Sequence, residues 1–171
     1  MATYPQGIEE RHGTAHGNRH ASWWRVGILA LVLLAALLGF LGGAPAPTLR
    51  AASAGASLAV TTPNRLRNGR MFETRISAVT KRPIEDAVIA IPVAMWRDVT
   101  INAMIPAPAE EEFVDGEFRF HFGPLKASER FGLKIDGQMN PPRYGKSSGR
   151  IRLLDGAREV VALPVTLKII P

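Results

Sequence analysis

Residues 71–79 read MFETRISAV, and this stretch indicates the fold more clearly than any other part of the chain. Every second residue from Phe72 to Ala78 is apolar or small, and the residues between them are charged or polar. A strand that lays one face on a hydrophobic core has this period. The turn dipeptide Asn-Gly at 68–69 comes shortly before it. The sequence therefore predicts a half-buried β-strand here.

Seven further runs show the same alternation or a bias toward β-branched residues. They lie at residues 57–61, 87–91, 99–105, 117–122, 130–137, 151–154 and 159–170. In the fourth run, Phe118, Phe120 and Phe122 occupy alternate positions and predict a buried face. Pro164 interrupts the last run. Because proline cannot donate a hydrogen bond to a sheet ladder, the last strand is expected at an edge or a bulge.

Seven to nine short strands within about 115 residues, without an amphipathic helix, predict an all-β domain over residues 57–171. The expected fold is an antiparallel immunoglobulin-like β-sandwich, and a small closed barrel is the alternative. The chain has no cysteine. This excludes the antibody-type Cys-Trp-Cys pattern, a disulfide framework, a thiolate zinc site and a cysteine nucleophile.

Trp96 stands just before the run 99–105, in which Val99, Ile101, Ala103 and Ile105 are expected on one face. A large aromatic residue at this place predicts a core residue between the sheets. The alternative is a partly exposed side chain that contacts a partner.

An apolar run, VGILALVLLAALLGFLGGAP, occupies residues 26–45 and contains no charged residue. As a helix, residues 26–44 would extend about 28 Å, close to the roughly 30 Å of a bilayer's hydrocarbon core. Trp23, Trp24 and Arg25 come directly before the run and are typical of a membrane boundary. The sequence predicts a transmembrane helix over 23–44 that is retained as a signal anchor.

The charges that flank this helix predict its orientation. Arg11, Arg19 and Arg25 lie on its N-terminal side, and Arg50 follows it. The positive-inside rule then places the N-terminus in the cytoplasm and the C-terminal domain in the periplasm or outside the cell. The predicted location is the cell membrane, with a single pass.

Two segments beside the helix are predicted to lack structure. Residues 1–22 have no apolar periodicity and predict a disordered cytoplasmic tail, and residues 45–56, rich in Ala, Pro and Gly, predict a linker. A cleaved signal peptide is an alternative to the anchor, because 52–54 read Ala-Ser-Ala, a small-x-small site. A core helix of a soluble protein is a further alternative, although the run has no polar face.

The chain resembles a known class of proteins. It resembles uncharacterised bacterial single-pass envelope proteins in three features. These are the span bordered by Trp-Trp-Arg, the stalk GGAPAPTLRA at 42–51 and the β-rich end LPVTLKIIP at 163–171. The segment from 70–79 into DAVIAIP at 86–92 is similar to adhesion-type and repeat-type bacterial immunoglobulin-like domains. The resemblance implies a fold and a compartment and carries over no functional residue.

Catalytic signatures are weak in this sequence. His121 is the one histidine in the predicted domain, and it is expected as a solvated residue on the polar side of its strand. No G-x-S-x-G is present, so a serine hydrolase is not favoured. His12, His16 and His20 are spaced by four and would share a helix face that could bind a metal, but intervening glycines favour a polar tail.

Charged clusters suggest binding surfaces instead. Five carboxylates lie within residues 110–117 and predict a negatively charged strand edge, with a calcium site as the alternative. Arg65, Arg67 and Arg70 form a basic cluster that could meet anionic headgroups or a polyanionic cell-wall component, or be a solvated loop. Residues 144–150 are a candidate binding loop that lacks the pattern of a phosphate loop.

These observations predict a non-enzymatic, membrane-anchored interaction or structural module of the bacterial cell envelope, without a cofactor or metal. Its expected partners are the lipid bilayer and another envelope or membrane protein, with no nucleic acid and no evident small-molecule substrate. The candidate partner contacts are Trp96, Arg65, Arg67 and Arg70. An accessory subunit that acts through its helix is the alternative, because small residues would allow close helix packing. An envelope metal-binding protein or hydrolase is less favoured.

Overall fold

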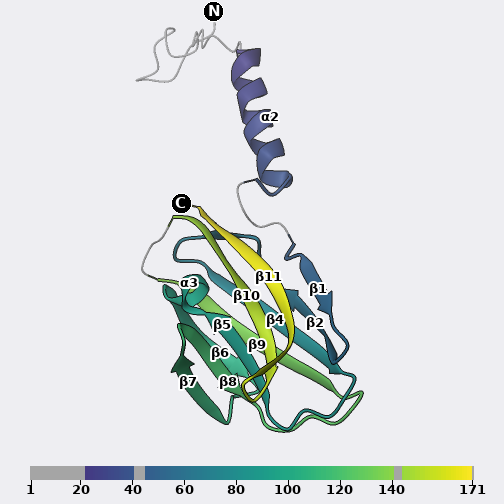
Figure 1. Cartoon of the computed structure of the whole chain (residues 1–171). Helices are drawn as coiled ribbons and strands as arrows, with labels where there is room; N and C mark the ends of the chain where they lie inside the picture. Colours follow the sequence, from purple (N-terminus) through teal and green to yellow (C-terminus); the bar gives the residue numbers. More distant parts are fainter. Residues whose placement is uncertain (1–21, 41–44, 141–143, 171) are drawn as a thin grey trace, which may run out of the picture. The chain divides into compact units, whose positions relative to one another are not determined.

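The computed structural model describes residues 22–40, 45–140 and 144–170 (Figure 1). The predicted N-terminal tail, apart from Ser22, and its three histidines lie outside the described residues. The chain divides into two compact units, Met1–Leu41 and Gly42–Pro171. The first contains helix α2, Trp23–Leu37, and the second contains the strands and a short helix, α3, Val93–Trp96.

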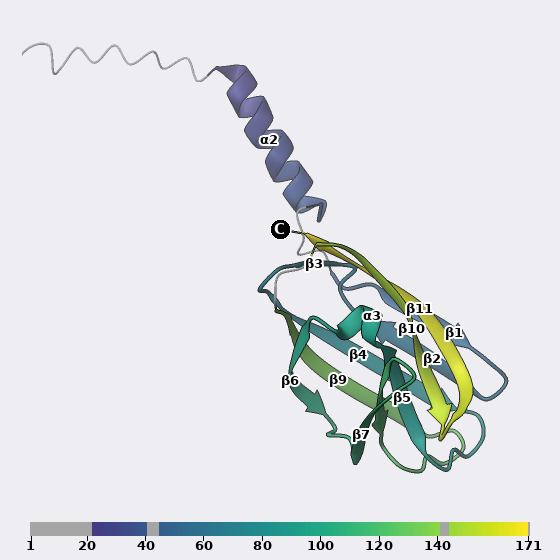
Figure 2. The ribbon, with the colours of Figure 1, turned by 60° about the vertical axis from the view of Figure 1, so that its left-hand side comes forward.

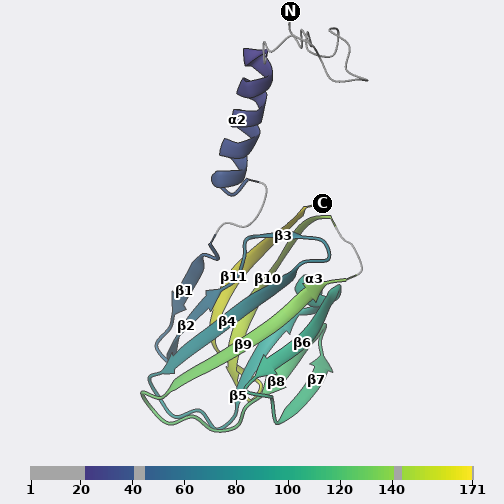
Figure 3. The same cartoon turned by 180° about the vertical axis from the view of Figure 1, so that it is seen from behind.

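Eleven strands in the described residues form two sheets that face each other (Figures 1 and 3). The five-stranded sheet has the order β1 (Thr48–Ala52), β2 (Ala56–Thr61), β4 (Met71–Thr80), β9 (Arg130–Met139) and β6 (Val99–Ile105). The six-stranded sheet has the order β3 (Arg65–Arg67), β11 (Arg158–Ile170), β10 (Gly145–Asp155), β5 (Ala87–Pro92), β8 (Glu117–His121) and β7 (Glu110–Val114). The all-β sandwich is therefore confirmed, and the barrel alternative is wrong.

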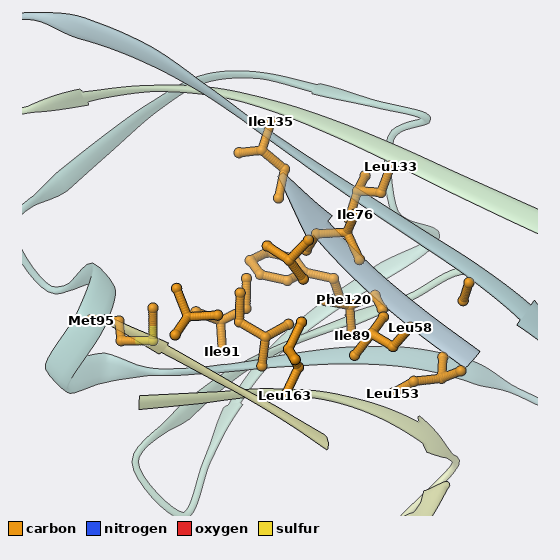
Figure 4. Packing of buried hydrophobic residues seen from close by; sticks show 14 of the residues in the cluster. Leu58, Ile76, Ile89, Ile91, Met95, Phe120, Leu133, Ile135, Leu153 and Leu163 are labelled. Atoms are coloured by element: carbon orange, nitrogen blue, oxygen red, sulfur yellow. The ribbon is translucent and has the colours of Figure 1, made fainter. Parts of the chain in front are cut away.

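The core lies between the two sheets, where both contribute apolar side chains (Figure 4). Leu58, Ile76 and Ile135 come from the five-stranded sheet, and Ile89 and Leu163 come from the six-stranded sheet. The alternation predicted for residues 71–79 is confirmed, since the side chains at 72, 74, 76 and 78 are buried and those between them are at least partly exposed. The predicted buried faces of 57–61, 130–137 and the last strand are confirmed as well.

The prediction of seven to nine antiparallel strands is wrong in count and in one pairing. β1 and β3 were not predicted as strands, and β7 was expected only as a negatively charged edge segment. β3 pairs with β11 in parallel, from Arg65 opposite Lys168 to Arg67 opposite Ile170. A three-residue strand and an acidic strand show no period-two pattern, so these two elements gave little signal.

The predicted linker over 45–56 also needs correction, because β1 lies within it and β2 begins there. β1 pairs with β2 from Thr48 opposite Thr61 to Ala52 opposite Ser57. The Ser53 hydroxyl accepts hydrogen bonds from the backbone N–H groups of Gly55 and Ala56, which closes the hairpin turn. Main-chain pairing and a polar turn, rather than an alternating apolar pattern, make this segment a strand.

The face predicted for 99–105 is wrong. The pairing of β6 with β9 shifts register between Ile101 and Ala103, which is a bulge. A bulge interrupts the alternation of side chains between the two faces. After the bulge, Met104 instead of Ile105 lies opposite the buried Ile135, and Ile105 is exposed. Ile101, before the bulge, is exposed as well.

Helix α2 is shorter than the predicted span over 23–44. It ends at Leu37, where Gly39 takes a φ of 75° and its N–H donates to the Ala36 carbonyl. Glycine adopts this left-handed conformation at little cost, and it commonly follows the last turn of a helix. In the part of the chain that the structure describes, no helix has both the length and the apolarity to cross a membrane.

Candidate functional site

The outer face of the six-stranded sheet carries a network of ion pairs, called here the charge ladder. It consists of Glu112, Asp115, Glu117, Arg119, Arg150, Arg152 and Glu159. Strand register places these residues side by side, since Glu112 lies opposite Arg119 on neighbouring strands. Ala90 of β5 lies between Arg119 and Arg152.

Each arginine of the charge ladder binds carboxylates from other positions of the sheet. Arg119 Nη1 lies 3.4 Å from Glu112 Oε1, and its Nη2 lies 3.5 Å from Asp115 Oδ2. Arg152 binds Glu117, and its Nη1 lies 3.3 Å from Glu159 Oε2. Partial burial by itself lowers the pKa of the Arg152 guanidinium, but the hydrogen bonds and charges of Glu117 and Glu159 outweigh this and raise it.

A hollow of about 570 Å³ lies beside the charge ladder. Its lining comprises Pro92, Asp115, Glu117, Arg119, Gly149, Arg150 and Arg152. The Nε atoms of Arg119 and Arg152 are buried and have no hydrogen-bond partner among the described residues. The arrangement can hold a polar group of either charge, although its own ion pairs already occupy most of the guanidinium groups.

A second hollow, of about 670 Å³, lies along the outer face of the five-stranded sheet. Ser57, Ala59 and Ser77 are among its lining residues, and Arg50 and Arg130 supply its positive charge. No carboxylate is among the residues that line it. Leu58 and Val79 are the larger apolar residues in this lining, and the remaining ones are small.

His121 is held between two carboxylates and is not the solvated residue that the sequence predicts. Its side chain is only 20% exposed. Nδ1 lies 2.6 Å from Asp86 Oδ2, and Nε2 lies 3.4 Å from Glu112 Oε1. Burial lowers the pKa of His121, but the hydrogen bonds and charges of Asp86 and Glu112 outweigh it, so the pKa lies above its ordinary value of 6.5.

His121 should therefore make the stability of the sandwich depend on pH. Because the folded-state pKa is raised, the stabilisation is fully present below the unfolded-state pKa of about 6.5 and is lost as the pH rises through the folded-state value. We expect the free energy of unfolding to fall over this range in wild type and to change much less in H121Q. Urea unfolding at a series of pH values measures it, and equal slopes in both proteins would contradict the assignment.

The Asp86–His121 pair contains two of the three members of a hydrolytic triad. The third member would be a hydroxyl at Nε2, but Nε2 faces Glu112. Among the described residues, no serine or threonine hydroxyl forms a hydrogen bond with His121. The pair is thus arranged to fix β8 against the segment before β5 rather than to activate a nucleophile.

The four lateral edges of the sandwich differ in how they are protected. β7 forms one edge of the six-stranded sheet and carries Glu110, Glu111 and Glu112. The prediction of an acidic strand edge is therefore confirmed. At the other edge, β3 covers β11 only at Lys168–Ile170, so the part of β11 that contains Pro164 is itself an edge, as the proline predicts.

β6 is the edge that lacks such protection. Its sequence, VTINAMI, contains no charge and no proline across seven residues. Ile101 and Ile105 are exposed, Ile105 to 59%. The sequence alone does not reveal this edge, because an exposed apolar strand and a buried one have the same composition. β1, the other edge of that sheet, has five residues, includes Arg50 and follows Pro47.

The candidate residues named from the sequence lie in different places. Trp96 is 4% exposed, so it is a core residue and its ring is not offered to a partner. Arg65 and Arg67 lie in β3, and Arg70 follows at the turn into β4. The predicted binding loop at 144–150 is mostly strand β10. Trp23, Trp24 and Arg25 form the first turn of α2, where the Arg25 guanidinium stacks over the Trp24 ring at 5.3 Å.

No protein-family model matches the chain, and no curated protein matches its sequence. Two solved structures from Pyrococcus furiosus are similar to it. One is a CARDB domain in complex with di-metal ions, with 12% identity and a TM-score of 0.43, covering 70% of this chain and 93% of that chain. The other is the chitin-binding domain of a chitinase, with 13% identity and a TM-score of 0.41, covering 67% of this chain and 100% of that chain.

Proposed function

We propose that this protein is a membrane-anchored, non-enzymatic interaction module of the bacterial cell envelope. The segment around α2 anchors it as a single-pass protein, with the N-terminus in the cytoplasm and the immunoglobulin-like sandwich outside. The sandwich binds a strand of another envelope protein along β6. The observation that carries this proposal is the exposed edge of β6, which has neither a charged residue nor a proline.

The sequence around α2 supports the anchor. The helix has no polar face, and the uncharged run from residue 26 continues beyond it to residue 45. The alternative of a cleaved signal peptide has a structural cost. Its site at 52–54 lies at the turn between β1 and β2, so cleavage there would remove β1 from the five-stranded sheet. A retained leader keeps that strand in place.

The chemistry of β6 supports strand addition. An edge strand offers unpaired backbone N–H and C=O groups that an extended segment can bind, and alternate side chains then supply specificity. Charges, prolines and short length normally block such pairing, and they are present at the other three edges. On β6, the exposed Ile101 and Ile105 would pack against apolar side chains of the incoming strand.

Site-specific photocrosslinking of the full-length chain in its native membrane tests this function. A photoreactive residue at Ala103 of β6 should give one discrete product, and the same residue at Glu111 of β7 should not. The substitution I105K should reduce the amount of the crosslinked product from Ala103 by about tenfold or more, since a lysine on the edge disfavours pairing. S77K, which places the same charge on exposed sheet surface, is the matched control and should leave the product unchanged.

Four outcomes would overturn the proposal or one of its parts. Equal products from β6 and β7, or an I105K product as strong as that of S77K, would remove β6 as the binding edge. If an unrelated transmembrane helix replaces α2 and the β6 product disappears, the protein acts through its helix instead. Release of the full-length chain from membranes by alkaline carbonate would refute the anchor.

A further inference from the structure

One end of the sandwich, called here the proximal end, contains both the entry of the chain into β1 and the end of β11 (Figure 2). The Pro47 carbonyl, just before β1, accepts a hydrogen bond from the Thr62 N–H. The Lys168 N–H of β11 donates to the Asn64 carbonyl at 2.8 Å. β3 and the turn that follows it also lie here, because the Asn68 N–H donates to the Ile170 carbonyl at 3.2 Å.

Positive charge gathers at the proximal end. Arg67 lies opposite Ile170, and Arg70 follows in the same turn, where its N–H donates to the Arg67 carbonyl. Lys146 and Lys168 lie opposite each other on β10 and β11. All four side chains belong to exposed residues, and none has an ion-pair partner among the described residues. Asp98, an acid near this end, pairs with Arg97 at 3.7 Å.

Exposed apolar side chains stand beside these charges. Met71 begins β4 directly after Arg70, and Tyr144 directly precedes β10. Each is 65% exposed. Aromatic and apolar residues that lie among basic residues are typical of protein surfaces that enter the headgroup region of a bilayer. A solvated basic loop needs no such side chains.

The opposite end of the sandwich, the distal end, does not share this character. The strand β10 of eleven residues separates the two ends by roughly 33 Å. In the distal turn, Arg158 Nη2 pairs with Asp155 Oδ2 at 2.7 Å. Glu85 and Asp86 lie there as well, since the Asp155 carboxylate accepts both of their backbone N–H groups. Both signs of charge are therefore mixed at that end.

We propose that the proximal end lies flat on the anionic headgroups of the membrane that anchors the chain, with Met71 and Tyr144 inserted among them. This inference rests on the proposed anchoring. Ten residues separate α2 from β1, and they reach at most about 35 Å when extended. An anchor in α2 therefore holds the proximal end near the bilayer, where anionic lipid attracts Arg67, Arg70, Lys146 and Lys168. Docking in this way keeps the β6 edge at a fixed height above the membrane.

The absence of cysteine from the chain permits a direct test with the full-length protein. N64C carries an environment-sensitive dye at the proximal end, and A157C carries it at the distal end. The protein is placed in nanodiscs of phosphatidylcholine, with or without phosphatidylglycerol, that contain a lipid-borne nitroxide quencher. We expect the proximal dye to be quenched at least about threefold more strongly in the anionic discs, because headgroup charge drives the contact. The distal dye should not respond.

Charge reversal provides the matched comparison. R67E/R70E should abolish the extra quenching of the proximal dye. The control R82E/K126E changes the net charge by the same amount at the distal end. It should retain the extra quenching of the proximal dye. High salt should weaken the contact, because screening shortens the range of the attraction.

Failure of this inference differs from failure of the anchor. A chain that incorporates into the discs but shows equal proximal quenching in both lipids, or unchanged quenching in R67E/R70E, overturns the docking and leaves the anchor intact. A chain that does not incorporate at all refutes the proposed anchor and the docking with it. A cell-wall polyanion as the true partner would give the first of these results.

Discussion

Replacement of Trp96 by alanine is expected to lower the free energy of unfolding of the sandwich by about 3–5 kcal/mol, the usual cost of truncating a large buried aromatic side chain. Trp96 ends helix α3 and is 4% exposed. Its ring packs against Phe120 of β8 with the centroids 6.1 Å apart and the planes tilted by 55°. Truncation removes this contact and leaves a cavity that a close-packed core fills only in part.

Urea unfolding of the full-length chain, followed by circular dichroism, measures the effect of W96A. Y144A is the matched control, because Tyr144 is aromatic and largely exposed, and we expect its free energy of unfolding to stay within about 0.5 kcal/mol of wild type. A loss below about 1 kcal/mol for W96A would contradict its core position and restore Trp96 as a candidate partner contact.

The sequence predicted those parts of the fold in which a single strand carries its own signal. β4, β8 and β9 alternate apolar and polar residues, because one face of each lies on the core. β1 does not alternate, since it is an edge strand whose side chains are mostly exposed. Its place in the sheet depends on backbone hydrogen bonds to β2, which any residue except proline can form.

The charge ladder was predictable only in part. Alternation along β8 predicted His121 on the polar face of its strand, and this is confirmed, with Arg119 on the same face. Their partners come from other strands or turns, such as Glu112 from β7 and Asp86 from the segment before β5. A list of residues in sequence order does not contain this pairing, because it depends on the order of strands in the sheet. His121 was consequently predicted as solvated when it is held between two carboxylates.

β6 shows a different limit. Its composition gave a correct strand prediction but a wrong face, because the bulge between Ile101 and Ala103 changes which side chains point inward. The same composition conceals its position at the edge of the sheet. The proposed binding edge is thus visible only once the strand order is known.

Leu154 is the subject of the second large expected effect. It lies opposite Val88 on the outer face of the six-stranded sheet, away from the sandwich core, yet it is only 1% exposed. With Val88 and Ala90 it forms a small separate apolar cluster. His121 lies opposite Val88, and Arg119 and Arg152 of the charge ladder lie on either side of Ala90. We expect L154A to lower the free energy of unfolding by about 2–5 kcal/mol, as truncation of a buried leucine does in a core.

The comparison with an exposed aliphatic residue makes this prediction specific. I105A also shortens a large aliphatic side chain on the sandwich, but Ile105 is exposed, and its loss should stay within about 0.5 kcal/mol. Similar small losses for both variants would mean that the charge ladder does not shield Leu154 from water. A large loss for L154A alone would mean that the long polar side chains of this face, besides forming ion pairs, cover apolar surface with their aliphatic parts. In that case the charge ladder stabilises the sheet mainly by burial, because ion pairs that remain partly exposed contribute little by themselves.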